Sequence, residues 1–295
     1  MRPEDFTFGI EIETTVDLTE ASQNGLYIGN HIYGQQVPYL PAGWKAKSDG
    51  SIRTTQPNRA GCEIVSPVLK GQDGLKQVLE VVKALEEKGH KVNATCGVHI
   101  HIGWEPTWGA TKLARLITVT SYLEKAIYAI TGTKNRERGQ WCGGVRKYGK
   151  PDEAEKNMKG SPSGGHYQRE RYHVLNITNL ATGSQNTVEF RAFSGSLNPT
   201  KIAGWVQACI GIVQRALTTK KSPGWVPAAP GGAWKKDGPG ASETERMLAY
   251  LGWTNGYARA IEKVQYGWLG LDGAPTQKQV AKEFRRLAKQ YDAQA

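Results

Sequence analysis

The stretch FGIEIET, residues 8–14, alternates apolar and acidic side chains with a period of two. In a β-strand this period sends the phenylalanine and both isoleucines to one face of the strand. It sends Glu11 and Glu13 together to the other face, so that two carboxylates lie side by side. The stretch therefore predicts a strand with one apolar face toward a core and one acidic face turned away from it.

Two later stretches repeat this alternation: VHIHI at residues 98–102 and VEFRA at residues 188–192. The first would carry two imidazoles on its polar face, and the second a carboxylate and a guanidinium. The side chains concerned are His99, His101, Glu189 and Arg191. Three such strands in one sheet would share a polar face, and we interpret that face as an active site.

Regular elements are expected around these strands. Apolar residues recur at helical spacing over 74–89, 111–130 and 198–217. Asn198 is a suitable N-cap for the last of these helices, and Pro199 suits its first turn. Further strands are predicted at 62–68, 172–178 and 186–193. Residues 16–43 are expected to be loop, with a short hairpin as the alternative for part of them. The pattern predicts a mixed chain of sheet and helices.

The order of elements suggests three regions. We expect a catalytic domain over residues 1–217, which includes a long basic loop at 133–171. A linker rich in proline and glycine covers 218–241, and a helical appendage covers 242–295. In the appendage, helices are expected at 242–250, 256–265 and 276–291.

Composition narrows the range of partners. The chain has 38 Lys and Arg against 27 Asp and Glu, a net charge of +11. This balance favours anionic partners, although a charge that serves only solubility explains it equally well. The four cysteines lie far apart without a C-x-x-C pair, so reduced thiols are expected. No leader-like or membrane-spanning apolar run occurs, and we expect a cytoplasmic protein.

The acidic and imidazole side chains on the predicted polar face are suited to holding metal ions. Several carboxylates on one face repel each other unless cations lie among them, and oxygen ligands with one or two imidazoles suit Mg²⁺ or Mn²⁺. The candidate ligands are Glu11, Glu13, Glu63, His99, His101 and Glu189. Arg191 would contact an anion bound there, as in phosphoryl transfer. Since no P-loop motif occurs, metals and arginines would have to hold the phosphates.

The order of these motifs resembles the amidoligase family, within the glutamine synthetase and glutamate–cysteine ligase superfamily. The segments that carry the resemblance are FGIEIE, DGS with CEIVSP, VNATCGVHIHIG and TVEFRAFSGSL followed by a helix. The resemblance spans about residues 7–217. It implies an α+β fold, a glutamine-synthetase-like antiparallel sheet with a concave catalytic face backed by helices. It also implies an ATP-dependent carboxylate–amine ligase that forms an amide or peptide bond through an acyl phosphate.

Carried over by residue, the resemblance assigns Glu13 and Glu63 to a metal ion beside the acyl phosphate. It assigns Glu11, Glu189 and either His99 or His101 to a metal ion that bridges the ATP phosphates. Arg191 would stabilise the transferring phosphoryl group. Superfamily enzymes usually supply a further acid, which no matching position provides here. Asp49 is a candidate, and the number of ions, two or more, stays open.

Arginines of the basic loop are candidates for gripping ATP or an acidic substrate, although a solvated loop surface explains them as well. Those assigned to the ATP site are Arg136, Arg146 and Arg171, together with Arg191. The expected substrates are a carboxylate and an amine donor: an amino acid, a peptide or a protein tail. The resemblance also allows an amidotransferase or cyclotransferase partner in the same pathway.

Two other functions fit the same residues. Glu-x-Glu and Glu-x-Arg pairs are ordinary on solvated sheet faces, and His-x-His could serve a zinc hydrolase that activates water. Alternatively, the chain is a basic nucleic-acid-binding protein with a degenerate catalytic face, whose binding would fall steeply with salt. Nucleotide binding separates the ligase from both alternatives.

Overall fold

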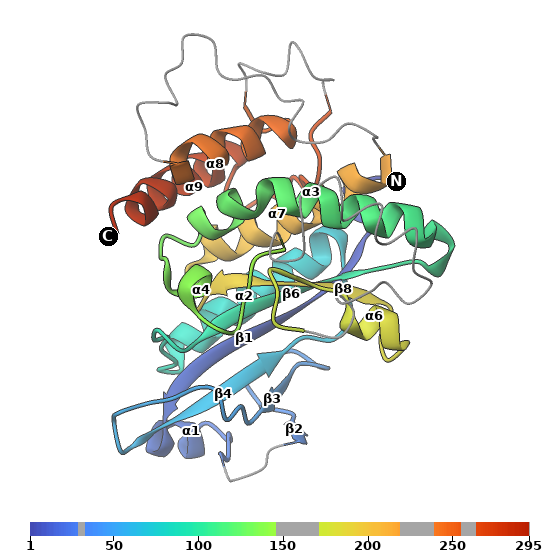
Figure 1. Cartoon of the computed structure of the whole chain (residues 1–295). Helices are drawn as coiled ribbons and strands as arrows, with labels where there is room; N and C mark the ends of the chain where they lie inside the picture. Colours follow the sequence, from blue (N-terminus) through green and yellow to red (C-terminus); the bar gives the residue numbers. More distant parts are fainter. Residues whose placement is uncertain (29–32, 146–170, 219–238, 255–263, 295) are drawn as a thin grey trace.

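The computed structural model describes residues 1–28, 33–145, 171–218, 239–254 and 264–294. Within these ranges the chain forms one eight-stranded sheet with helices packed against it (Figure 1). Its strands are β1 Thr7–Asp17, β2 Tyr33–Gln35, β3 Lys45–Lys47, β4 Arg59–Val65, β5 Leu69–Lys70, β6 Gly97–Gly103, β7 Leu175–Asn176 and β8 Thr187–Ser194. Their order is β2-β3-β4-β1-β6-β8-β7, and β5 pairs with β1. All the named strand pairs in the described chain are antiparallel, which confirms the predicted antiparallel sheet with helices.

The three alternating strands lie next to one another, as predicted. β1 pairs with β6, and β6 pairs with β8. The register sets Glu11 opposite His99, and it sets His101 opposite Glu189. On the other side of β1, Glu13 lies opposite Glu63 of β4. Because residues directly opposite in a sheet point to the same face, the acids and imidazoles share one polar face.

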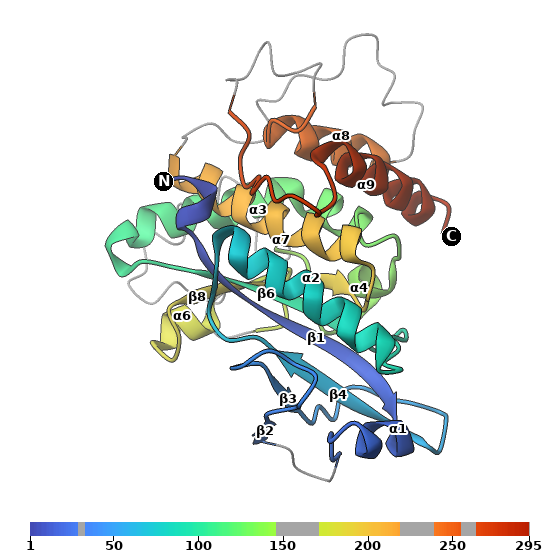
Figure 2. The same ribbon diagram turned by 180° about the vertical axis from the view of Figure 1, so that it is seen from behind.

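The apolar face of these strands lies against two helices, α2 Gly71–Glu87 and α7 Pro199–Thr218. Figure 2 shows α2 lying over β1. Gly74 lets α2 approach closely, because a Cβ there would lie 3.1 Å from the ring of Phe8. At the other end, Phe193 stacks on Trp205 of α7 at 4.9 Å between ring centroids. These contacts bury Ile10 and the neighbouring apolar residues of the strands.

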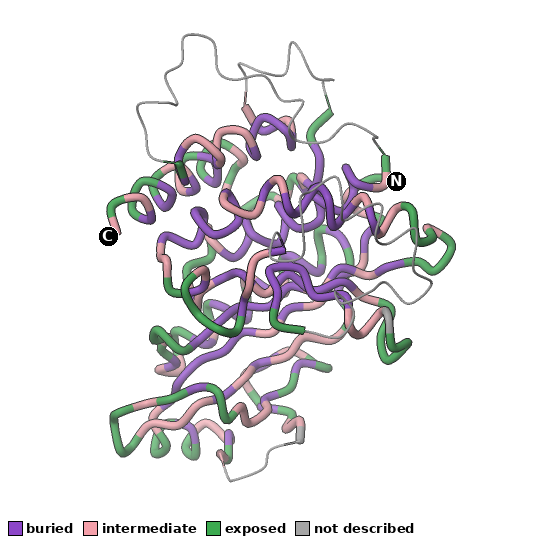
Figure 3. The backbone as a smooth tube through the Cα atoms, viewed as in Figure 1, coloured by how far each residue is buried: buried purple, intermediate pink, exposed green. Residues whose placement is uncertain are grey.

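Three more helices continue the same hydrophobic core beyond α7. They are α3 Gly109–Ala129, α8 Pro239–Tyr250 and α9 Gln277–Asp292. α8 packs on α3 and α9, and α9 also contacts α7 (Figure 1). The buried residues run continuously from the central strands into these helices (Figure 3). Among the described helices, none combines the length and apolar character needed to cross a bilayer.

Several local expectations are confirmed and others are wrong. Thr276 caps α9 as expected, and Asn198 caps α7 by accepting a bond from Lys201 N at 3.0 Å. Residues 16–43 are not all loop: β1 runs on to Asp17, whose side chain caps the short helix α1 Leu18–Gln23 by accepting bonds from two backbone N–H groups. This cap followed by LTEAS was a readable helix signal.

The expected strand at 172–178 shrinks to β7, because α6 Thr178–Thr182 takes over. A second short helix, α4 Asn135–Arg138, lies at the start of the segment expected to be a basic loop. Much of that loop (146–170), most of the expected linker (219–238) and the expected helix near 256–265 lie largely outside the described residues. The three-region division therefore stays a prediction.

Candidate functional site

His99 lies at the centre of the polar face, among three carboxylates. Its Nδ1 is 3.2 Å from Glu11 and 3.5 Å from Glu189, and its Nε2 is 3.6 Å from Glu13. His99 is buried, and its three partners come from β1 and β8 on either side of β6. One imidazole facing three carboxylates is a site where negative charge exceeds positive charge.

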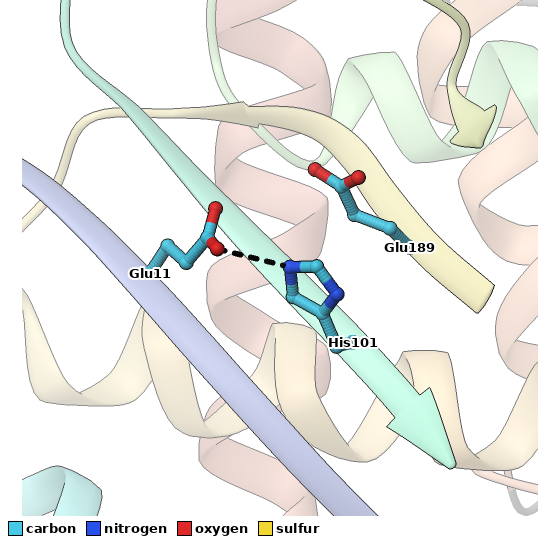
Figure 4. A group of neighbouring side chains, drawn as sticks. All are labelled: Glu11, His101 and Glu189. Atoms are coloured by element: carbon cyan, nitrogen blue, oxygen red, sulfur yellow. Dashed lines mark ion pairs between the residues drawn. The ribbon is translucent and has the colours of Figure 1, made fainter. Parts of the chain in front are cut away.

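Glu11, His101 and Glu189 form a second group, drawn in Figure 4, which places one side chain on each of three neighbouring strands. His101 Nε2 lies 3.4 Å from Glu11. Burial opposes ionisation of both groups, but His101 and His99 together outweigh it at Glu11, and Glu11 and Glu189 together outweigh it at His101. As a result the pKa of Glu11 is lowered, and the pKa of His101 is raised, with the Glu189 charge adding to that rise. Glu11 is therefore an ionised carboxylate within the site.

Glu13, Asp49 and Glu63 form a third group, in which one oxygen from each lies within 4.8 Å of the others. Burial, together with the negative charges of Glu11, Asp49 and Glu13, raises the pKa of Glu63 to about 8. This carboxyl group therefore resists ionisation, although the positive charge of Lys47 partly opposes the rise. The acid that the sequence left unplaced, Asp49, is thus brought beside Glu13 and Glu63.

Glu189 is held rigidly by two neighbours. Asn176 of β7 donates its side-chain N–H to Glu189 at 2.6 Å, and Arg191 makes a short ion pair with the same carboxylate. β8 carries a bulge here, because Val98 pairs with Phe193 while Ile100 pairs with Phe190. Bulges commonly re-aim side chains beside active sites. At this bulge Arg191 and Ala192 together lie across from His99. Within the described chain the Nε of Arg191 has no hydrogen-bond partner.

Gly97 and Arg136 are site residues of a different kind. The backbone N–H of Gly97 donates to Glu13 at 2.6 Å. A Cβ at Gly97 would lie 2.7 Å from the Nη2 of Arg136, so a larger residue there would displace that guanidinium. Arg136 Nη2 donates to the carbonyl of Arg191 at 2.7 Å and lies 3.4 Å from His99. The glycine before VHIHI was a weak signal, and its role was missed from sequence.

A cavity of about 620 Å³ opens at the Glu13 end of the cluster. Its lining includes Asp49 and His99, and the aromatic residues Trp141 and Tyr172 lie beside each other at 5.1 Å. Four arginines line it: Arg53, Arg136, Arg171 and Arg191. We call this the arginine cavity. Its size is that of a pocket for a drug-sized ligand, and its charge suits an anionic one.

A second cavity of about 420 Å³ opens at the Glu11 end. Glu11 and His101 are its ionisable lining residues, and no Lys or Arg of the described chain lines it. Apolar residues form much of the wall, among them Phe8, Ile10, Val65, Pro67 and Val68. We call this the apolar cavity. The two cavities lie at the two ends of one acidic cluster.

The donor set fits hard divalent cations. Three overlapping groups can each place three ligand atoms within 4.8 Å: the second and third groups above, and Glu11 with Glu63 and His99. Five of the seven residues involved offer carboxylate oxygens. Mg²⁺ and Mn²⁺ prefer oxygen with at most a few imidazoles, whereas structural zinc prefers sulfur and nitrogen. The excess negative charge around Glu63 and His99 would be balanced by such ions.

The predicted site residues are largely brought together. All six candidate ligands lie in the cluster, which comprises Glu11, Glu13, Glu63, His99, His101 and Glu189. Arg191 lies at its edge, and Arg136 and Arg171 line the arginine cavity. Arg146 lies outside the described residues. Whether these side chains bind metal or nucleotide stays a prediction.

Comparison with known proteins identifies a family whose model covers most of the chain. A family model described as "Putative amidoligase enzyme" matches residues 4–213. None of the curated proteins matches. Similar solved structures include a GmaS/ADP complex, at 12% identity and TM-score 0.44, covering 97% of this chain and 68% of that one. Another is a bifunctional glutathione synthetase from Pasteurella multocida, at 12% and 0.42, covering 99% and 52%.

Proposed function

Because a match of this extent shows that the chain belongs to the amidoligase family, we propose that it is an ATP-dependent carboxylate–amine ligase. The observation that carries the proposal is one oxygen-rich cluster with a cavity of different character at each end. A ligase of this kind must bring two unlike ligands, a nucleotide and a carboxylate, to the same metal site.

We assign the nucleotide to the apolar cavity. A purine base is flat and largely apolar, and Phe8, Pro67 and Val68 offer apolar wall. The triphosphate would then extend toward Glu11 and His101 at the inner end. The carboxylate substrate belongs in the arginine cavity, where Arg53 and Arg136 favour its negative charge. This departs from the expectation that Arg136 and Arg171 bind ATP.

The reaction takes place where the two cavities meet. A carboxylate oxygen of the substrate attacks the γ-phosphorus of ATP, the bond between the β- and γ-phosphates breaks, and ADP leaves. The resulting acyl phosphate is attacked at its carbonyl carbon by the amine. The amide forms, and inorganic phosphate leaves with a proton from the amine. Arg191, whose Nε has no partner in the described chain, supplies a donor for the transferring phosphoryl group.

Two sets of side chains would hold the metal ions. Glu13, Glu63 and Asp49 would hold one on the side of the arginine cavity. Glu11 and Glu189 with a histidine would hold the other, and both His99 and His101 lie close enough to serve. When bound, Mg²⁺ neutralises these carboxylates and stabilises the charge on the phosphate oxygens. The protein's own part is to fix the ligands, which Asn176 and Gly97 do by hydrogen bonds to Glu189 and Glu13.

The direct test is ADP release with ATP, Mg²⁺ and mixed amino acids or short acidic peptides as carboxylates and amines. We expect ADP and phosphate to form in equal amounts only when both co-substrates are present. Glu13→Gln should lower the rate of this release by about 10² to 10³ without unfolding the protein. Glu80→Gln is the matched control, because Glu80 is an exposed glutamate on α2, far from the cluster.

Calorimetry of ATP binding tests the proposal even if the carboxylate and amine substrates are not found. ATP should bind in millimolar Mg²⁺ even without a carboxylate. If no nucleotide binds, the ligase proposal is wrong. A tightly held zinc ion together with no effect of ATP on the melting temperature would instead favour a hydrolase.

A further inference from the structure

Arg136 projects into the arginine cavity from a helix too short to be stable alone. α4 is a single turn, Asn135–Arg138, and isolated turns of this length do not persist in water. Yet Arg136 is buried to 8% exposure, and its Nε has no hydrogen-bond partner within the described chain. Something outside α4 must therefore hold this turn against the sheet.

The end of α9, far away in sequence, makes those contacts. The hydroxyl of Tyr291 donates to the carboxylate of Glu137, the residue next to Arg136, in a short hydrogen bond. Lys125 of α3 pairs with the same carboxylate and donates to the Tyr291 hydroxyl at 3.1 Å. Tyr291 itself is buried to 1% exposure, so its ring is fixed by the core.

Gln294, just beyond α9, holds the chain on the other side of the turn. Its side-chain N–H donates to the carbonyl of Gly132 at 2.8 Å, and its side-chain oxygen accepts from the backbone N–H of Lys134 at 3.0 Å. The ammonium of Lys134 also reaches the Gln294 carbonyl and lies over the Tyr291 ring at 5.5 Å. The entry to α4 is thus bonded to the same short segment as Glu137.

We infer that Tyr291 and Gln294 are positioning residues that hold α4 in place, so that Arg136 faces the carboxylate substrate. We call these two residues the α9 clamp. That Arg136 faces a carboxylate substrate rests on the proposed function. That the α9 clamp holds α4 rests only on the contacts of Tyr291 and Gln294. On this inference the helices after residue 239 contribute to substrate binding without touching the substrate.

The clamp can be measured without any substrate. In the variant Tyr291→Phe with Gln294→Ala, the ring at position 291 stays in the core. The hydroxyl bonds to Glu137 and Lys125 are lost, and so are the side-chain bonds of Gln294 to the backbone of Gly132 and Lys134. Hydrogen–deuterium exchange of the backbone amides of residues 132–140 should rise about tenfold or more. Arg136 should also react faster with phenylglyoxal, as followed by mass spectrometry of its peptide.

The matched control breaks another contact of α9. Arg285 pairs with Glu245 of α8 through two hydrogen bonds, away from α4. Glu245→Gln should leave exchange at 132–140 and the reactivity of Arg136 within about twofold of the wild type. If Glu245→Gln and the clamp variant act alike, α9 serves only general stability and the inference is wrong.

A conservative variant and the kinetics complete the test. Glu137→Gln keeps an oxygen that accepts from Tyr291 and should restrain α4 more than Glu137→Ala does. In the ADP-release assay the clamp variant should raise the KM of the carboxylate about tenfold and leave ATP binding by calorimetry unchanged. If the wild type consumes no ATP, the proposed function fails, while exchange and phenylglyoxal reactivity still decide the clamp. Unchanged exchange in the clamp variant overturns the inference.

Discussion

The arginine cavity and the apolar cavity share one acidic cluster but differ in how they are built. Four arginines line the first, and three of them come from segments outside the alternating strands. The second is lined mainly by β1, the end of β4 and the residues that follow it, and β6, without a described lysine or arginine. The difference teaches that the sheet supplies the acidic cluster, while segments added to the sheet supply most of the positive charge beside it.

The largest effect should come from the two glutamates of β1, which face different cavities. Glu13→Gln should lower the rate of ADP formation by about 10² to 10³ while ATP still binds, because it removes a charge beside the proposed carboxylate site. Glu11→Gln should weaken ATP binding itself, since it acts at the apolar cavity. Calorimetry with ATP and Mg²⁺ separates them, and equal loss of ATP binding in both variants would break the comparison.

A smaller effect is expected from Arg136→Gln. Losing a charged hydrogen bond to the substrate should raise the KM of the carboxylate about 100-fold, with the affinity for ATP unchanged. Arg138→Gln is the matched control, because it removes the same charge from the exposed side of the same turn. A rise in the ATP dissociation constant for Arg136→Gln would move the nucleotide into the arginine cavity.

The reciprocal change at the apolar cavity is Val68→Asp. Val68 is 81% exposed on the lining, so the substitution should not disturb the fold. A carboxylate there would repel the phosphates and weaken ATP binding about tenfold, more at low salt than at high salt. Val68→Thr, which adds no charge, should bind ATP like the wild type. Equal affinities for all three proteins would refute the assignment of ATP to this cavity.

The smallest effect on activity is expected from a change at His90. It should affect ligand affinity at the two cavities equally. This buried residue bonds to Thr14 at 2.9 Å and to Tyr39 at 2.8 Å behind the polar face. Burial, with a contribution from the Arg59 charge, lowers its pKa to about 4 from an ordinary value of 6.5. Since the unfolded chain binds this proton more readily, the stabilisation is complete above pH 6.5 and is lost as the pH falls toward 4.

Urea unfolding at pH 7 and pH 5 measures this contribution. The free energy of unfolding should fall by about 2 kcal/mol more in the wild type than in His90→Gln, because the glutamine cannot titrate. The ratio of the ATP affinity to the carboxylate affinity should be the same at pH 7 and at pH 5. If the wild type loses no more stability than His90→Gln, then His90 binds its proton as readily in the folded protein as in the unfolded chain.

Much of the sheet and of the candidate ligand set was predictable, because both depend on local alternation. Period-two patterns set Glu11 with Glu13, His99 with His101, and Glu189 with Arg191 on the polar face of their own strands, β1, β6 and β8. The parts that were missed are those whose signal is weak or non-local. The role of Gly97 is an example, since it depends on an arginine 39 positions later in the sequence.

The sequence by itself determined which side chains share a face, because strand geometry leaves a strand only two faces. Only the tertiary structure decided the rest. Register across strands brought Glu13 opposite Glu63, and folding of the segment after β3 brought Asp49 beside them. Packing of α9 on α4 brought Tyr291 to Glu137. These contacts join residues 14 to 154 positions apart, and no local periodicity specifies which distant surfaces will meet.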